Sequence, residues 1–199
     1  MTRCRRALLT CAFVLSATLA SVFGVGGGAL AQPFSELRGG VYAHDVPFLQ
    51  NSNETRSPDI NLDLLFKSPD FLTYILSPRP HIGATVNTDG GTSLFYAGFD
   101  WTFALMDNIL TSDDGLFVGG SLDMAVHDGR IGRNDVKNPD GTYKDNSYGC
   151  RWAFHESFTV GYSFGPNAVM LTGEHLSNAN LCDENNGITN FGVRYGYRF

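Results

Sequence analysis

Apolar side chains alternate with polar or small ones along most of the chain, and this period of two constrains the fold more than any other feature. Every second residue from Phe95 to Leu105 is apolar, and the residues between them include Gly98, Asp100 and Thr102. Successive side chains of a β-strand point to opposite faces of a sheet. The pattern predicts eight strands, at residues 37–44, 59–66, 80–87, 94–105, 116–127, 151–164, 167–178 and 190–199.

A soluble sandwich also alternates, but three further features favour a barrel that spans a membrane. Most of the strands have about ten residues or more, the length that a tilted strand needs to cross a bilayer. One face is apolar and rich in aromatic residues, whereas the other is polar or small, as a narrow polar interior requires. The last strand ends on Phe199, which resembles the terminal signal of bacterial outer-membrane proteins. We therefore predict an all-β fold, an eight-stranded antiparallel transmembrane β-barrel of the outer-membrane type.

Residues 1–31 have the form of a secretory signal peptide. Three arginines lie among the first six residues, an apolar stretch follows, and Ala29 and Ala31 place small residues at positions −3 and −1 of a cleavage site. A retained membrane helix is the alternative, because the apolar stretch is long enough. Four glycines between residues 24 and 28 would weaken such a helix. We expect cleavage after Ala31, which leaves residues 32–199 as one barrel domain in the bacterial outer membrane.

The lengths of the loops indicate which end of the barrel faces outward, and this orientation places the two cysteines. With the N-terminus on the periplasmic side, the outer loops are expected at residues 46–58, 88–92, 128–149 and 179–187, whereas 68–78 is long for a periplasmic turn. Cys150 and Cys182 both lie on the outer side, and a disulfide between them is geometrically allowed in an oxidising compartment. The sequence leaves open whether they are bonded and whether the barrel is a monomer or a homodimer.

A polar pair interrupts the apolar face of the seventh strand. On that face Val169 and Leu171 are followed, beyond a glycine, by His175 and Ser177. Two residues apart on a strand, these side chains are neighbours, and a Ser next to a His is the minimum for an activated nucleophile. The alternative is a polar rim at the membrane interface, where polar side chains are tolerated.

The residues around this pair resemble a known family. The stretch His-Leu-Ser-Asn-Ala-Asn at residues 175–180, followed by Asn-Asn-Gly-Ile at residues 185–188, is similar to the active-site region of the lipid A 3-O-deacylase (PagL) or acyloxyacyl hydrolase family. Members of that family are eight-stranded outer-membrane barrels with a Ser-His-Glu triad on the lipid-facing side. The motif covers about 25 residues near the C-terminus. The rest of the chain resembles the family only in its strand count and its signal peptide.

The resemblance implies roles for individual residues. Ser177 corresponds to the nucleophile and His175 to the general base, while Asn178 and Asn185 correspond to the asparagines of the oxyanion hole. The implied substrate is lipid A of lipopolysaccharide, which would lose an ester-linked 3-hydroxyacyl chain. Such acyl transfer needs no cofactor, and the sequence contains no P-loop, paired-Cys metal motif or His-Glu-x-x-His helix.

One position departs from the family pattern. Where the family has the glutamate of its triad, this sequence has Thr189, which can orient an imidazole but cannot stabilise its charge. If Gly165-Pro166 forms a two-residue turn, Glu156 lies directly opposite His175 on the neighbouring strand. We therefore hypothesise that Glu156 orients His175 in place of the missing glutamate. Asp183 and Glu184 in the following loop are weaker candidates.

Other functions fit the sequence less well. The net charge of −6 argues against a nucleic-acid partner. Eight strands leave an interior filled by side chains, which disfavours a porin. The remaining histidines fall on the inward face, where a solvated polar residue is the ordinary expectation. They are His44, His81, His127 and His155. The main alternative to an esterase is a catalytically inert barrel with a structural or adhesive role, and Thr189 favours it.

Overall fold

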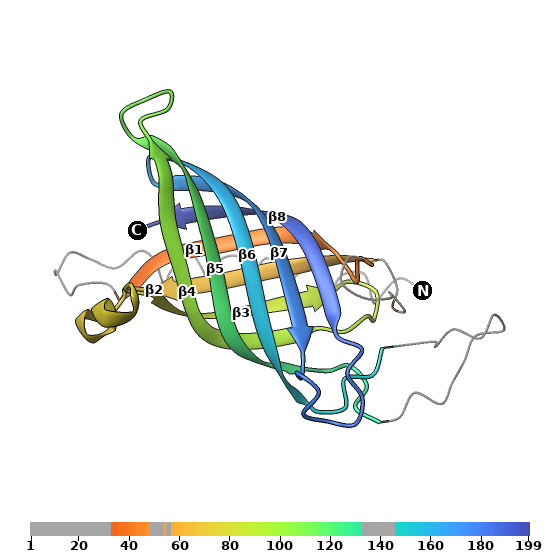
Figure 1. The fold of residues 1–199 in the computed structure, drawn as a ribbon. Helices are drawn as coiled ribbons and strands as arrows, with labels where there is room; N and C mark the ends of the chain where they lie inside the picture. Colours follow the sequence, from red (N-terminus) through yellow and green to blue (C-terminus); the bar gives the residue numbers. More distant parts are fainter. Residues whose placement is uncertain (1–32, 48–53, 55–56, 133–145) are drawn as a thin grey trace, which may run out of the picture. The chain divides into compact units, whose positions relative to one another are not determined.

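The described part of the chain folds into a closed antiparallel barrel whose eight strands follow one another in sequence order (Figure 1). The computed structural model describes residues 33–47, 54, 57–132 and 146–199, so the signal peptide predicted at residues 1–31 lies outside the described residues. The strands are β1 (Phe34–Ala43), β2 (Pro58–Phe66), β3 (Arg79–Asn87), β4 (Leu94–Asp107), β5 (Asp114–His127), β6 (Trp152–Phe164), β7 (Asn167–Ser177) and β8 (Ile188–Arg198). Pairing of β1 with β8 closes the sheet, and the predicted fold class is confirmed.

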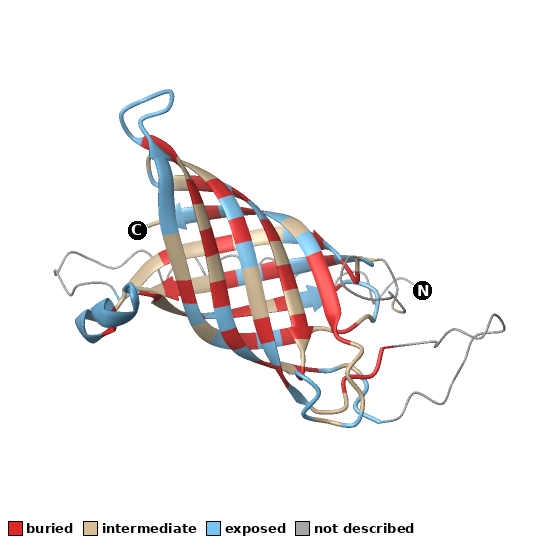
Figure 2. Ribbon diagram, viewed as in Figure 1, coloured by how far each residue is buried: buried red, intermediate tan, exposed pale blue. Residues whose placement is uncertain are grey.

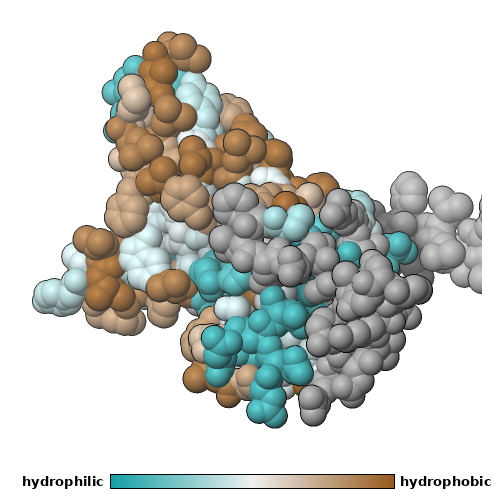
Figure 3. All heavy atoms as spheres, turned by 45° about the vertical axis from the view of Figure 1, so that its right-hand side comes forward, coloured by the Kyte–Doolittle hydropathy of each residue, from teal (hydrophilic) through white to brown (hydrophobic). Residues whose placement is uncertain are grey.

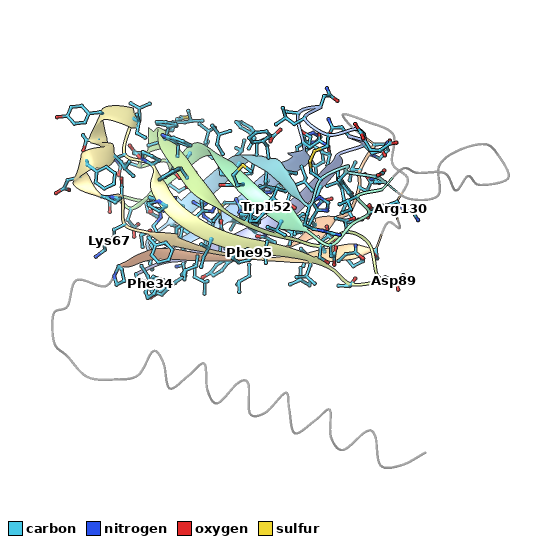
Figure 4. All side chains as sticks on the ribbon, turned by 90° about the horizontal axis from the view of Figure 1, so that it is seen from below. Phe34, Lys67, Asp89, Phe95, Arg130 and Trp152 are labelled. Atoms are coloured by element: carbon cyan, nitrogen blue, oxygen red, sulfur yellow. A yellow bond between two sulfur atoms is a disulfide. The ribbon has the colours of Figure 1, made fainter. Side chains whose placement is uncertain are left out.

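The two ends of the barrel differ in their connections. At the turn end, short segments join β4 to β5 and β6 to β7, and a longer one joins β2 to β3; at the loop end, the remaining segments join β1 to β2, β3 to β4, β5 to β6 and β7 to β8. Phe34 and Lys67 lie at the turn end in Figure 4, and Asp89 and Arg130 lie at the opposite, loop end. The long turn after β2 contains a 3₁₀-helix, η1 (Asp70–Ile75). Among the described residues, no helix has the length and apolar character to cross a membrane.

The register of β6 and β7 follows from a tight turn. Phe164 pairs with Asn167 across Gly165-Pro166, as predicted. Gly165 has φ of +55°, which glycine adopts without strain, and proline fixes a negative φ at the next position. This combination is that of a type II′ hairpin turn. The turn therefore sets which residues face each other along the whole β6–β7 pair.

Burial alternates along most of the sheet (Figure 2), except at the end of β4, where residues 103–107 are all exposed. Outward side chains are apolar and exposed, including Leu122 and Leu171 at 65% each, whereas their sequence neighbours are buried. In Figure 3 hydrophobic residues cover much of the wall, and hydrophilic residues gather at the end turned toward the viewer. A wall of this kind suits the hydrocarbon of a bilayer, and a closed barrel has no unpaired edge strand inside it.

Inside the barrel, charged groups form a connected chain that corrects one expectation. His81 contacts Asp63 and Asp123 at 2.8 and 2.7 Å, and His155 contacts Asp123 at 2.8 Å and Glu174 at 3.3 Å. Both imidazoles are almost completely buried. The expectation of solvated interior histidines is therefore wrong, and His44 and His127 are buried as well. Around His81 and His155, carboxylates from other strands of the barrel occupy the space that water would fill.

A second interior cluster surrounds Arg38 near the turn end. Its guanidinium lies 2.9 Å from both Glu36 and Asp100, and all three side chains are at most 3% exposed. Arg79 contacts the same two carboxylates from β3, at 2.6 and 2.8 Å. Two buried carboxylates thus share two arginines, which satisfies charges that would otherwise be costly inside the barrel.

At the loop end, the Glu54 carboxylate contacts residues of several inter-strand segments. Its carboxylate accepts hydrogen bonds from Thr92, both from the backbone N–H at 2.7 Å and from the hydroxyl at 2.8 Å. Tyr148 donates its hydroxyl proton to Glu54 at 2.8 Å, and His44 lies 3.1 Å from it. His44 also lies 2.9 Å from Asp59. The connections after β1, β3 and β5 are therefore joined through one carboxylate.

We predict that Arg38→Met destabilises the barrel by about 3 kcal/mol, because it leaves buried carboxylates incompletely paired. The matched control is Arg198→Met. Arg198 reaches the same Glu36 at 4.0 Å, but its side chain is 40% exposed, and we expect a loss below about 1 kcal/mol. The measurement is urea unfolding of the detergent-refolded barrel, followed by gel mobility. Equal losses for the two variants would contradict this account of the cluster.

We also predict a pH dependence from the outer cluster. Burial of the His44 ring disfavours its charged form, but hydrogen bonds to Asp59 and Glu54 outweigh burial and raise the pKa of His44 to about 9. Because this value exceeds the unfolded pKa of about 6.5, the stabilisation is fully present below that pH and is lost as the pH rises through about 9. Unfolding measured from pH 6 to 10 should show a loss of about 2 kcal/mol that His44→Gln does not show. A wild-type profile parallel to that of His44→Gln would rule out the effect.

Candidate active site

The loop-end part of β7 carries the polar pair, His175 and Ser177, on the outer wall of the barrel. Val169 and Leu171 are exposed on this face, and His175 and Ser177 continue it at the loop end, each half-buried. The residue between them, Leu176, points inward and is buried. Strand alternation therefore places both polar side chains on the apolar side of the barrel, where a polar group has few partners unless neighbouring strands supply them.

The neighbouring strands place two polar residues in one row with His175. Glu156 on β6 pairs directly with His175, as the predicted turn register required. Thr189 on β8 pairs with His175 from the other side. Cross-strand partners of this kind have Cβ atoms about 5 Å apart. The imidazole is thus flanked by a carboxylate on one strand and a hydroxyl on the other.

Thr189 makes the hydrogen bond that fixes the ring. His175 Nδ1 and Thr189 Oγ1 lie 2.8 Å apart, and Thr189 is only 2% exposed. Glu156, which was hypothesised to orient His175, is half-buried and has no hydrogen bond to the ring among the described residues. In the structure the orienting contact therefore comes from the threonine, while the carboxylate faces the ring across the strand pair.

The loop after β7 holds the two candidate oxyanion residues. Asn178 donates its backbone N–H to Asn185 Oδ1 at 2.9 Å. Both protons of the Asn178 side-chain amide are donated to backbone carbonyls, those of Tyr148 and Glu184, each at 2.6 Å. Asn185 donates one amide proton to Asn180 at 3.2 Å. Of the two asparagines, Asn185 therefore retains a side-chain donor, whereas the donors of Asn178 are used within the loops.

Two residues of this loop adopt an unusual backbone conformation. Ala179 and Asn180 have φ of 53° and 60°. Consecutive residues in the left-handed region turn the chain sharply and cost conformational energy for an alanine. The tight turn brings Asn185 back over the end of β7, next to the residue that follows Ser177.

Cys150 and Cys182 form a disulfide between the connection before β6 and the loop after β7. Their Cα atoms are 5.9 Å apart, within the usual range for a disulfide. The bond joins residues that are 32 positions apart in the sequence. It therefore links the two connections that flank the candidate site.

An apolar groove of about 400 Å³ lies on the outer wall directly below His175. Gly173, the next outward residue along β7, has no side chain to fill it; a Cβ there would lie 2.6 Å from the Phe191 ring. The groove is lined by Phe158, Val160, Leu171, Thr172, Gly173, Phe191, Gly192 and Val193. A second groove, of about 430 Å³, lies beside Glu156 between β4, β5 and β6. Such shapes suit a hydrocarbon chain that reaches the wall from the bilayer.

Several groups of this site carry no signal in the sequence. The carbonyls of Tyr148 and Glu184 hold Asn178, but every residue has a carbonyl and none marks itself as an acceptor. The role of Gly173 could have been suspected, since a glycine on an otherwise apolar strand face lets a neighbouring group, here the Phe191 ring, lie close to the backbone. The row of Glu156, His175 and Thr189, by contrast, follows from alternation and turn length.

Two solved structures are similar to this chain in fold. The crystal structure of the outer membrane enzyme PagL aligns with a TM-score of 0.60 at 15% identity, covering 83% of this chain and 100% of that chain. The N-terminal β-barrel domain of Pseudomonas aeruginosa OprF aligns with a TM-score of 0.46 at 8% identity, covering 84% of this chain and 98% of that chain. No curated protein sequence matches the chain.

The family model of lipid A 3-O-deacylase (PagL) matches residues 83–198. The matched region contains β4 to β8, and with them every candidate site residue. Since it spans more than half of the 199 residues, the chain belongs to the lipid A 3-O-deacylase (PagL) family.

Proposed function

We propose that the protein is an outer-membrane esterase that removes an ester-linked 3-hydroxyacyl chain from lipid A. The observation that carries this proposal is the placement of His175 and Ser177 on an apolar wall, with the ring held by Thr189 and an apolar groove beneath it. Buried or lipid-facing polar groups are costly unless they have hydrogen-bond partners, so polar side chains on the wall point to a function. Family membership supplies the substrate class.

In the proposed reaction, Ser177 is the nucleophile and His175 the general base. Because Nδ1 is engaged by Thr189, Nε2 is the nitrogen left to take the hydroxyl proton of Ser177 as its Oγ attacks the ester carbonyl carbon. The bond from carbonyl carbon to the lipid A oxygen then breaks, and that oxygen takes the proton from His175. Water attacks the resulting acyl-serine by the reverse proton route, releasing the 3-hydroxy fatty acid and restoring Ser177.

The developing oxyanion needs a hydrogen-bond donor, and the free amide proton of Asn185 is the best placed candidate. Its Oδ1 accepts from the Asn178 backbone, which fixes the direction of the Nδ2 group. We assign Asn178 a positioning role, because its own amide protons are donated to carbonyls of the two loops. A single preorganised donor of this kind contributes about 10²–10³ in kcat in a well-studied protease.

Two residues share the role of the family glutamate in this proposal. In the proposed mechanism His175 Nδ1 carries the proton and donates it in a hydrogen bond to Thr189 Oγ1, 2.8 Å away, and Glu156 supplies negative charge to the imidazolium from the neighbouring strand. A carboxylate at the directly paired position of the neighbouring strand attracts the imidazolium without a hydrogen bond, because the medium is of low polarity. The turnover of such a pair is expected to be lower than that of a hydrogen-bonded carboxylate.

Location and access follow from the same placement. We propose export by the signal peptide at residues 1–31 and insertion into the outer membrane, with the loop end facing outward. Lipid A would reach the outer wall by lateral diffusion, its acyl chain lying in the groove below His175 and its sugar at the level of the loops. Nothing in this mechanism requires a cofactor.

The alternative function is an inert barrel with a structural or adhesive role. The replacement of the family glutamate by Thr189 favours it. The contact between His175 and Thr189 favours the enzyme, because a ring held in one orientation on the lipid side serves no purpose in an inert wall.

We predict that the wild-type barrel, expressed in a Gram-negative host without its own deacylase, releases one 3-hydroxyacyl chain from lipid A. Ser177→Ala should lower the rate by at least about 10³-fold, because it removes the nucleophile. Mass spectrometry of extracted lipid A measures the loss, and heat-dependent gel mobility controls for insertion. Unchanged lipid A from correctly inserted wild-type protein would favour the inert barrel.

We further predict that Thr189→Val lowers kcat by about 10- to 100-fold, whereas Thr189→Ser, which keeps the hydroxyl, retains most of the activity. Glu156→Gln should lower kcat by about 10-fold, because it removes the charge but not the volume. Assays use purified lipid A in detergent micelles. Full activity of Glu156→Gln would remove that carboxylate from the mechanism, and a Thr189→Val variant equal to Thr189→Ser would remove the hydroxyl.

A further inference from the structure

The connection before β6 and the loop after β7 are attached to each other at several points. Ser147 donates its N–H to Asn186 Oδ1 at 2.8 Å, and Asn186 donates its N–H to the Ser147 carbonyl at 3.0 Å. Asn178 bridges the same two segments through the carbonyls of Tyr148 and Glu184. The disulfide from Cys150 adds a covalent link. We call residues 146–150 the anchor segment.

Gly149 allows the anchor segment to touch the loop backbone directly. It has φ of +67°, and a Cβ on it would lie 2.4 Å from the Glu184 carbonyl oxygen and 2.9 Å from Cys182 Cβ. Any other residue would push the two segments apart. The close approach therefore depends on glycine for its conformation and for its missing side chain.

The anchor segment is itself fixed to the barrel. The Tyr148 side chain is 1% exposed, and its hydroxyl donates to Glu54 at 2.8 Å. Its backbone N–H donates to the Arg130 carbonyl at 2.9 Å. His127, the last residue of β5, contacts the Cys150 carbonyl at 2.7 Å through Nε2. The segment is therefore held on the side away from the loop as firmly as on the side facing it.

These contacts converge on the two residues that flank Asn185. On one side the Glu184 carbonyl is held by Asn178 and packs against Gly149; on the other, Asn186 exchanges two hydrogen bonds with Ser147. Asn185 itself is tied to Asn178. The position of its amide group is thus determined by the anchor segment, although no residue of that segment touches it in these contacts.

We propose that the anchor segment and the Cys150–Cys182 disulfide position Asn185 as the oxyanion donor, so that full deacylase activity requires the oxidised protein. This inference rests on the proposed function. Cys150, Cys182 and Gly149 are positioning residues, which act through Asn185 and not on the substrate. Without the disulfide the loop keeps its hydrogen bonds but gains conformational freedom, and a donor displaced by about 1 Å can cost up to about 10²-fold in rate.

The test compares wild type with the Cys150→Ser/Cys182→Ser variant, each assayed on lipid A in micelles with and without a thiol reductant. We expect reductant to lower the wild-type kcat by about 10-fold with little change in KM. The double variant should start at that lower value and not respond to reductant. Wild type that is active and unaffected by verified reduction would overturn the inference while leaving the proposed function intact; inactive oxidised wild type would instead overturn the proposed function.

An Asn185→Ala background separates positioning from general loosening of the barrel. If the disulfide acts through Asn185, reduction should cause no further loss once that side chain is gone. A further loss of about 10-fold in Asn185→Ala would show that the disulfide acts elsewhere and would contradict the inference.

A pair of glycine variants tests the contact without touching the cysteines. Gly149→Ala should lower kcat by about 10-fold, because its Cβ meets the loop backbone. Gly90→Ala is the matched control: Gly90 also has a positive φ, of +82°, but nothing lies within 4 Å of its Cβ position. Similar activities in the two variants, with both barrels folded, would exclude the contact as a positioning element.

Discussion

Closure of the sheet is the constraint on which the rest of this structure depends. A closed antiparallel barrel pairs every strand with two neighbours and leaves only two environments for side chains, an interior and an outer wall. The interior of eight strands is narrow, so its charged groups must neutralise one another, as Arg38, Glu36 and Asp100 do. The wall must be apolar. A polar group on the wall is therefore informative, and His175 stands there with partners from both neighbouring strands.

The fold was predictable because it follows from alternation, which the sequence displays directly. Strand positions and the register across Gly165-Pro166 could be deduced from residue types alone. The 3₁₀-helix η1 in the segment predicted as a long turn was not deduced, since no period marks six residues. The pairing of the interior histidines was also missed. Parity tells that His81 and His155 point inward, and Asp123 is the direct cross-strand partner of His155. The contact of Asp123 with His81, two strands away, depends on the curvature of the closed barrel.

The candidate site likewise has one part that could be predicted from the sequence and one part that could not. Its strand part, with Glu156 opposite His175, could be predicted from the turn, and the family model extends the match well beyond the short motif, from residue 83 onward. Its loop part could not. The contacts of Asn178 are made to backbone carbonyls across two connections, and neither spacing nor composition encodes them. The hydrogen bond of Thr189 could be predicted only in part, because strand pairing places the residue beside His175 but does not give the direction of its hydroxyl.

If Thr189 stands where the family has its glutamate, as proposed, the position of β7 offers a physical explanation. A triad carboxylate has two functions. It accepts a hydrogen bond from a ring N–H, and it offsets the charge that the ring acquires. Because β7 has a neighbour on each side, the proposed mechanism separates the two functions: Thr189 on β8 would accept the hydrogen bond, and Glu156 on β6 would supply the charge. Glu156 remains closer to the loop end than to the middle of the wall, where a carboxylate is least costly in a bilayer. Such a separation would lose the strength of a charged hydrogen bond but retain the orientation of the proposed base.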